Sequence, residues 1–260
     1  MPHLTTDDAM PQLMTDDGCR LWTEVTGQGP RVVLVHGGPG WWDVFHHLSL
    51  PGFTLQRWDQ RGCGRSDRRG PYTLDRYVAD LAAVAGPDPC IVIGHSWGAA
   101  LALEYAQAHP HAVERLVLVS SVGLDGPPAD YRARVAALLA ETPEDDPWIA
   151  QISVNIADRE TAVDWSRKLN TPWFEPNPVC AEALRAELKA LPDRAAACAR
   201  AVVPTLLVHG AEDLRPPYVT DSLLDALPNA ERVVLDGVGH YPWIEDPDGF
   251  QKVVREFLAS

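Results

Sequence analysis

The sequence predicts an α/β fold, a mostly parallel sheet with helices on both faces and a small helical cap inserted into it. Short, nearly uninterrupted apolar runs recur along the chain, as expected for strands covered by helices on both faces. In the middle of the chain these runs give way to helical segments. We therefore expect a first part of the core at residues 1–122, the cap at 123–201 and a second part of the core at 202–260.

The strand candidates are short apolar runs rich in β-branched residues. In chain order they are residues 31–36, 53–58, 90–93, 115–120, 205–209 and 233–235. The run at 90–93 leads into residues 99–106, which contain no Gly, Pro or β-branched residue and therefore favour a helix. Residues 248–258 are the candidate for a closing helix.

The predicted cap contains helical candidates at residues 131–140 and 181–191 and an acidic stretch at 141–146. Four aromatic side chains fall in this region: Trp148, Trp165, Trp173 and Phe174. Aromatic residues line pockets in some proteins, but packing of a small helical lid is their commoner role. We expect packing here.

Composition limits the possible partners. A chain of 260 residues with 46% hydrophobic residues has enough material for one large core. Its formal net charge of -14 argues against nucleic acid as a partner, because binding phosphates requires a basic surface, and it mildly favours a cationic substrate. Residues 1–17 contain no apolar run, so we expect neither a signal peptide nor a membrane anchor, and a cytoplasmic enzyme.

The cysteines show no pattern of a metal or redox site. They are odd in number, widely spread and without C-x-x-C spacing, so we expect free thiols in a reducing compartment. The five are Cys19, Cys63, Cys90, Cys180 and Cys198. No cofactor fingerprint and no converging metal ligands are visible, and we expect neither a cofactor nor a metal.

The strongest chemical motif is Gly94-His95-Ser96-Trp97-Gly98, a G-x-S-x-G sequence between a predicted strand and a predicted helix. At such a turn the serine is strained with its hydroxyl exposed, and flanking glycines are needed because side chains there would collide with neighbouring backbone. The strand before and the helix after it make the match specific. We predict that Ser96 is a catalytic nucleophile.

A serine hydroxyl is a poor nucleophile without a neighbouring base, and that base needs a carboxylate to fix its tautomer. Asp213 follows the predicted strand at 205–209, and His240 follows the next strand. Because open α/β sheets gather their active sites at the carboxyl ends of the strands, both side chains are expected beside Ser96. The chain order serine, acid, histidine is typical of α/β hydrolases.

Other acids and histidines lie near these positions. Glu212 is a rival to Asp213, but neighbouring side chains point in different directions and the residue nearer the loop is preferred. His95 adjoins the nucleophile, so its side chain must project elsewhere, and we expect it to pack or to support a loop. His36 and His209 end strands and are expected to form hydrogen bonds within loops.

Hydrolysis also needs donors for the oxyanion of the tetrahedral intermediate, usually two backbone N–H groups. Trp97, which follows the nucleophile, can provide one. The loop at 36–40 can provide the second through Gly38, because glycine lets the backbone approach the substrate and proline has no N–H.

Three stretches together resemble the proline iminopeptidase (prolyl aminopeptidase) branch of the α/β-hydrolase superfamily: His36-Gly-Gly-Pro-Gly40, Asp59-Gln-Arg-Gly-Cys-Gly-Arg-Ser66 and Gly94-His-Ser-Trp-Gly98. The resemblance spans the sheet region on both sides of the cap. It implies an α/β-hydrolase fold, no cofactor, and cleavage of small N-terminal residues from peptides. It also implies a triad of Ser96, Asp213 and His240 and an oxyanion hole at Gly38 and Trp97.

Within these stretches, we expect Asp59, Arg61 and Arg65 to tie the oxyanion loop to the core through charge-assisted hydrogen bonds, and Cys63 to pack. Members of the family hold the amino group of the substrate with carboxylates of the cap. Four acidic residues of the cap could do so, although none matches by motif and each is expected to be a solvated surface charge. They are Glu160, Asp164, Glu175 and Glu182.

The sequence departs from the family at Trp41 and Trp42, where small residues are usual, and in its short cap. The leading interpretation is a serine hydrolase like the proline iminopeptidases, acting through an acyl-enzyme on a small molecule or a short peptide. The first alternative is a carboxylesterase or lactonase on small apolar esters. An alternative of another class is a ligand-binding protein that keeps the fold but barely turns over.

Overall fold

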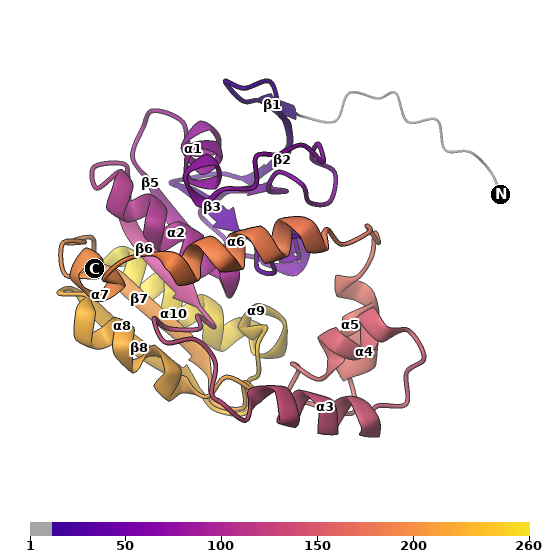
Figure 1. Ribbon diagram of the computed structural model, residues 1–260. Coiled ribbons are helices and arrows are strands. Elements are labelled where there is room, and N and C mark those ends of the chain that lie inside the picture. Colours follow the sequence, from indigo (N-terminus) through magenta and orange to yellow (C-terminus); the bar gives the residue numbers. More distant parts are fainter. Residues whose placement is uncertain (1–11) are drawn as a thin grey trace.

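A single eight-stranded sheet forms the centre of the computed structural model, which describes residues 12–260 (Figure 1). The strand order is β1-β2-β4-β3-β5-β6-β7-β8. The strands are β1 (Gln12–Met14), β2 (Arg20–Gly27), β3 (Arg31–Val35), β4 (Thr54–Trp58), β5 (Cys90–His95), β6 (Val113–Val119), β7 (Thr205–Gly210) and β8 (Ala230–Leu235). Of the strand pairings within residues 12–260, only those made by β2 are antiparallel. The mostly parallel sheet that the sequence predicts is confirmed.

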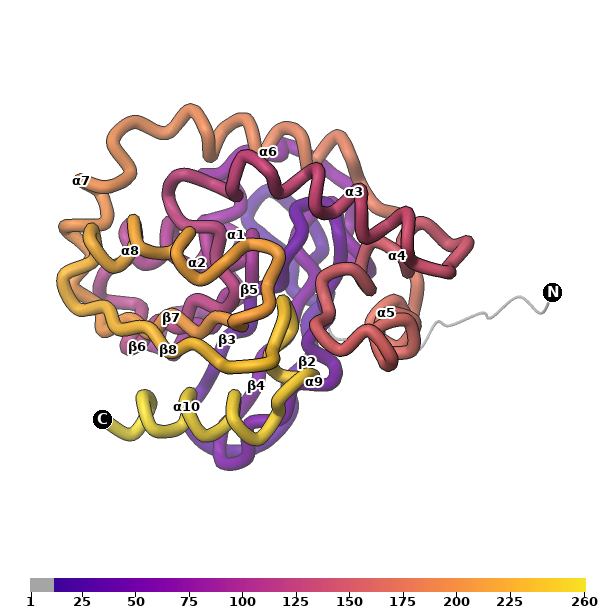
Figure 2. Tube along the Cα trace, turned by 90° about the horizontal axis from the view of Figure 1, so that it is seen from below, coloured from indigo at the N-terminus to yellow at the C-terminus, as the bar shows by residue number. Residues whose placement is uncertain are grey.

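Helices cover both faces of this sheet (Figure 2). On one side lie α1 (Leu74–Ala85), α2 (Trp97–Ala108) and α8 (Asp221–Ala226), and on the other lies α10 (Pro247–Ala259), which follows the short α9 (Pro242–Glu245). Alternate strand residues belong to the two layers of core: Val33 and Val35 pack with α1 and α2, whereas Val32 and Leu34 pack with α10. Successive side chains of a strand point to opposite faces of the sheet, and here both faces are covered by helices. Side chains on both faces must therefore be apolar, and this explains the continuous apolar runs.

Five helices occupy the chain between β6 and β7. They are α3 (Tyr131–Glu141), α4 (Pro147–Ser153), α5 (Ala162–Leu169), α6 (Pro178–Ala190) and α7 (Arg194–Cys198). Figure 1 shows α3, α4 and α5 grouped beside the sheet, while α6 returns across it. Helix α6 packs on the core through Cys180 and Leu184. The limits of a cap at residues 123–201 stay a prediction.

Two 3-10 turns (Phe45–His47 and Pro217–Thr220) complete the described elements. No helix within residues 12–260 is both long and apolar enough to cross a membrane. All five cysteines are buried, and none of them forms a disulfide bond.

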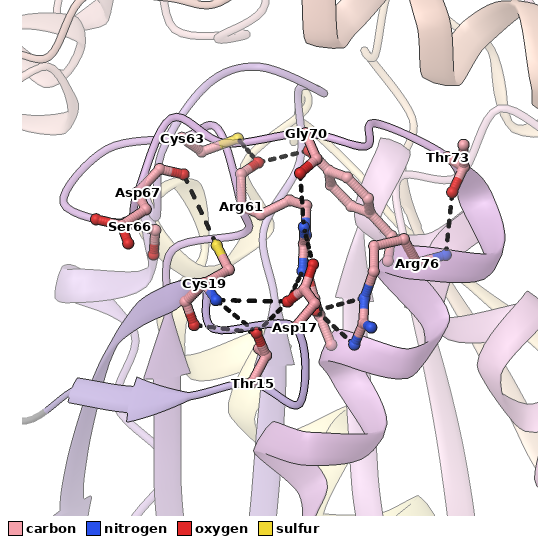
Figure 3. Close-up of polar contacts among 12 residues, drawn as sticks. Thr15, Asp17, Cys19, Arg61, Cys63, Ser66, Asp67, Gly70, Thr73 and Arg76 are labelled. Atoms are coloured by element: carbon pink, nitrogen blue, oxygen red, sulfur yellow. Dashed lines mark hydrogen bonds and ion pairs between the residues drawn. The ribbon is translucent and has the colours of Figure 1, made fainter.

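A buried arginine anchors the loop after β4 (Figure 3). Arg61 Nε donates to Asp80 Oδ2 at 2.6 Å, and its two terminal nitrogens donate to the two carboxylate oxygens of Asp17 at 2.9 and 3.0 Å. Arg61 thus makes charge-assisted hydrogen bonds as expected, but they hold the loop after β4 and none of them reaches the loop at residues 36–40. Asp80 lies on α1 and is fully buried, so the arginine joins the loop to that helix and to the segment before β2.

Candidate active site

Ser96 lies at the sharp turn between β5 and α2. Its backbone has φ 54° and ψ -116°, a conformation that is rare for a residue with a side chain. A Cβ on Gly94 would lie 2.3 Å from Gly98 O, and a Cβ on Gly98 would lie 2.0 Å from Val35 O. The two glycines of the motif are therefore required by the close approach of backbone. The turn leaves the Ser96 side chain half-buried and facing a cavity.

Asp213 and His240 meet at the carboxyl ends of β7 and β8. Their side chains are joined by a hydrogen bond of 2.6 Å between His240 Nδ1 and Asp213 Oδ2, and both are buried. The neighbouring Glu212 is exposed, so the rival acid does not lie in this contact. Ser96 and His240 line the same cavity. Within residues 12–260 they share no hydrogen bond, and catalytic hydrogen bonds of this kind often tighten only when substrate binds.

Burial and charge set the protonation of this pair. Burial lowers the pKa of His240 because it disfavours the charged imidazolium. The carboxylate of Asp213 raises this pKa, whereas the positive charge of Arg215 lowers it further. Burial by itself would raise the pKa of Asp213. The charges of His240 and Arg215 and the hydrogen bond from His240 outweigh burial and hold that pKa below its ordinary value. The imidazole is therefore neutral and able to accept a proton near neutral pH, beside an ionised carboxylate.

Arg215 is a member of this cluster that sequence reasoning missed. Its Nη1 lies 3.4 Å from Asp213 Oδ1 and 3.4 Å from His240 Nδ1, and it donates to Asn155 Oδ1 at 3.2 Å. Its other terminal nitrogen donates to the Tyr131 hydroxyl. The only signal in the sequence is its position two residues after Asp213, in a loop that follows a strand.

The two predicted oxyanion donors also face the cavity. Trp97 is the first residue of α2, so its N–H has no partner within the helix. Gly38 has φ 63°, and its N–H donates to no group within residues 12–260. A Cβ at Gly38 would lie 2.9 Å from Trp41 Cγ, so both the backbone conformation and the space favour glycine there. Both residues thus border the cavity that Ser96 lines, and each has an N–H group without a hydrogen-bond partner within residues 12–260.

A chain of hydrogen bonds supports these donors. Gln60 donates from its backbone to His36 Nε2 at 3.1 Å and from its side chain to His36 O at 2.8 Å, and it accepts from Trp97 Nε1 at 3.1 Å. Asp59 accepts from Arg65 Nε at 2.6 Å, as expected. These contacts join the loops after β3 and β4 to the first residue of α2.

The other histidines have structural contacts. His95 Nε2 lies 2.9 Å from His240 O and His209 Nε2 lies 2.7 Å from Arg215 O, so both support loops of the site, as predicted. No group of three or more His, Cys, Asp or Glu residues in the described part of the chain is arranged to hold a metal ion.

The cavity above Ser96 has a volume of about 740 Å³. Its apolar wall includes Trp41, Trp42, Val44, Trp97, Ala100 and Val122. None of the four cap aromatics lines it. Trp148 packs edge-on against Trp41 with ring centroids 5.7 Å apart, and Phe174 packs against Trp42 at 5.9 Å, so these two support the wall from outside.

The charged residues of the cavity differ from what the sequence suggests. Four cationic side chains line it: Arg132, Arg185, Lys189 and Arg215. Among residues 12–260, no aspartate or glutamate does so, and none of the four candidate cap carboxylates is present there. The acidity of the whole chain mildly favours a cationic substrate, but the cavity is positively charged.

Comparison with known proteins agrees with this architecture. A family model described as "Alpha/beta hydrolase family" matches residues 32–253. The chain is 32% identical to Lipase LipV of Mycobacterium tuberculosis over 89% of its length and 94% of that protein. It is 25% identical to a proline iminopeptidase of Lactobacillus delbrueckii subsp. lactis over 93% of its length and 94% of that protein.

Among solved structures, a meta-cleavage product hydrolase from Pseudomonas fluorescens IP01 superposes with a TM-score of 0.77 at 22% identity. The match covers 96% of this chain and 97% of that one. At this identity the likeness shows the fold alone.

Proposed function

The chain belongs to the alpha/beta hydrolase family, and from this premise we propose that it is a serine hydrolase that cleaves small esters or amides through an acyl-enzyme. The observation that carries the proposal is the shared cavity of Ser96 and His240, in which the imidazole is held by a 2.6 Å hydrogen bond to Asp213. Ser96 would be the nucleophile, His240 the general base and Asp213 the orienting acid.

In the proposed reaction, Ser96 Oγ attacks the carbonyl carbon while His240 Nε2 takes the hydroxyl proton. The oxyanion that forms accepts hydrogen bonds from the N–H groups of Gly38 and Trp97. The leaving group departs with the proton from His240, and the acyl group stays on the serine. A water molecule, deprotonated by the same imidazole, then hydrolyses the acyl-enzyme, and the proton returns to Ser96.

Of the two substrate classes that the sequence suggests, the ester class suits the cavity better. A peptide N-terminus is cationic, and four cations with no carboxylate would surround it in this cavity. The aminopeptidase remains a second candidate, favoured by the resemblance of the motifs and by the proline iminopeptidase relative. Turnover of a short-chain aryl ester without turnover of a prolyl arylamide would support the esterase; the reverse result would support the aminopeptidase.

The direct test of a serine hydrolase is covalent labelling. A fluorophosphonate probe is expected to modify the wild-type protein at about one probe per chain, at Ser96, because only an activated serine attacks it rapidly. Ser96→Ala should prevent the modification. Intact-mass and peptide mass spectrometry measure both results. Folded wild-type protein that takes up no probe would contradict the proposal and favour the ligand-binding alternative.

The charge of Arg215 should also be visible in the pH profile. Because Arg215 lowers the pKa of His240, replacing it with glutamine should raise that pKa and move the acid limb of kcat/KM to higher pH. Arg215→Lys keeps the charge and should keep the limb near its wild-type position. Profiles between about pH 5 and about pH 9 on a neutral ester measure the effect.

The control for that profile is Lys252→Gln, which removes one charge from α10, away from the cavity. If Lys252→Gln moved the limb as far as Arg215→Gln does, net charge rather than the local contact would be the cause. A cytoplasmic location, a small-molecule or short-peptide substrate and the lack of a cofactor stay predictions.

A further inference from the structure

The cationic residues of this chain are almost all engaged with other groups. Of its 22 lysines and arginines, all but four make a side-chain hydrogen bond, an ion pair or a cation–π contact within residues 12–260. The four exceptions are Arg132, Arg185, Lys189 and Lys252, and the first three line the cavity above Ser96. Cations without partners are thus concentrated at the candidate active site.

Helix α6 supplies two of these cations from one face. Arg185, Leu188 and Lys189 stand at positions i, i+3 and i+4, which share one side of a helix, and all three line the cavity. The adjacent face carries Cys180 and Leu184 into the core, and Leu188 packs partly against the same core, so the orientation of the helix is fixed. Because α6 is held in this way, its two cations are presented to the cavity together.

The local arrangement is unfavourable without an anion. Like charges at i and i+4 of a helix repel each other. Arg132, on the first turn of α3, adds a third positive charge, and within residues 12–260 no carboxylate lines the cavity to neutralise them. In a protein of net charge -14, this site is the place where an anion would be drawn in and held.

We propose that the substrate is an anion: an ester with a carboxylate at a distance from the reacting carbonyl, bound by Arg185, Lys189 and Arg132. The apolar wall formed by Trp41, Trp42 and their neighbours then covers the part of the substrate between the two groups. This inference rests on the proposed function. The chemistry is hydrolysis of the ester bond: the acyl carbon gains the hydroxyl of water, and the leaving oxygen gains its proton.

The test compares esters that differ in charge alone. Monomethyl adipate carries the carboxylate on the acyl side and is compared with its neutral primary amide, methyl 6-amino-6-oxohexanoate. The acetate ester of 4-hydroxybenzoate carries it on the leaving side and is compared with 4-acetoxybenzamide. In at least one pair we expect kcat/KM to be about tenfold or more higher for the anion, and the pair that shows the effect locates the carboxylate.

Variants assign the effect to the three cations. Arg185→Gln combined with Lys189→Gln should raise KM for the preferred anionic ester by about tenfold and leave kcat/KM for its neutral partner within about twofold. Lys252→Gln, which removes the fourth cation that has no partner, should change neither. Raising the salt concentration from about 0.05 M to about 0.5 M should weaken the preference in the wild type, because salt screens exposed charges.

The outcomes separate the inference from the proposed function. If the neutral esters are cleaved and the anionic ones are no better, or if the double variant leaves the preference intact, the inference is overturned while the serine hydrolase stands. If no ester of either kind is cleaved and Ser96 is not labelled by a fluorophosphonate, the proposed function fails and the inference fails with it. A preference for the methyl ester of 6-aminohexanoic acid would overturn the inference and favour the aminopeptidase.

Discussion

Ser96→Ala is expected to lower kcat/KM on the best small ester by at least about 10⁴-fold, because removal of the nucleophile leaves only the oxyanion donors and substrate binding. The loss should lie in kcat, with KM little changed, since Ser96 bonds covalently to the substrate only in the reaction. Ser96 is half-buried at the cavity and its hydroxyl makes no hydrogen bond within residues 12–260, so alanine should keep the free energy of unfolding close to that of the wild type.

Steady-state kinetics and thermal unfolding measure these two quantities. A matched control is Ser166→Ala, which removes a serine hydroxyl on α5 whose hydrogen bond goes to Ala162 O and which does not line the cavity. It should keep the wild-type kcat. Turnover by a folded Ser96→Ala protein within about tenfold of the wild type would contradict the nucleophile assignment, since removing the serine of a triad costs about 10⁶-fold in kcat where it has been measured.

The central strands were predictable from sequence because of where they lie. Strands β3, β5, β6 and β7 are buried on both faces over most of their length, so most of their residues are apolar and the runs stand out. Strand β2 lies near the edge and mixes polar and apolar residues, so it has no such run. In β2 the alternation of apolar and polar residues is too weak to indicate a strand. The strand becomes evident only in the structure, where β2 pairs with β4.

Helix α1 was missed for a different reason. One of its buried positions is Asp80, which reads as a surface residue in the sequence but pairs with Arg61, 19 positions earlier. The second partner, Asp17, lies 44 positions before the arginine. Pairings over such separations have no local signature, so the sequence could suggest that Arg61 makes charge-assisted hydrogen bonds but not that Asp80 and Asp17 are its partners.

The candidate site, too, has residues that the sequence could predict and residues that it could not. Ser96 could be predicted because close backbone contacts allow only glycine at positions 94 and 98, two residues to either side of it, and this leaves a short sequence motif. The charge of the cavity could not be predicted, because the i, i+4 spacing of Arg185 and Lys189 is also common on helix faces that are simply exposed to solvent. They become informative only once α6 is seen to return over the sheet and turn that face toward Ser96.

Asp213→Asn is expected to lower kcat by about 10⁴-fold, close to the effect of losing the nucleophile. The amide can donate to His240 Nδ1 and so favours the tautomer that carries its proton on Nε2, where the base must be free. The charge also matters. Without the carboxylate, the imidazolium that forms during attack would face Arg215, 3.4 Å away, with no compensating anion. This arginine should make the loss at least as large as in triads that lack one.

The matched control is Glu212→Gln, the same chemical change one residue earlier, on a side chain that is exposed and outside the pair. It should keep the wild-type kcat on a neutral ester. Thermal unfolding must accompany the kinetics, because Asp213 also accepts a hydrogen bond from the Arg215 backbone at 2.9 Å, which the asparagine oxygen can still accept. If a folded Asp213→Asn protein kept its activity while Glu212→Gln lost it, the orienting acid would be Glu212, and the 2.6 Å contact with His240 would have to be a feature of the resting enzyme alone.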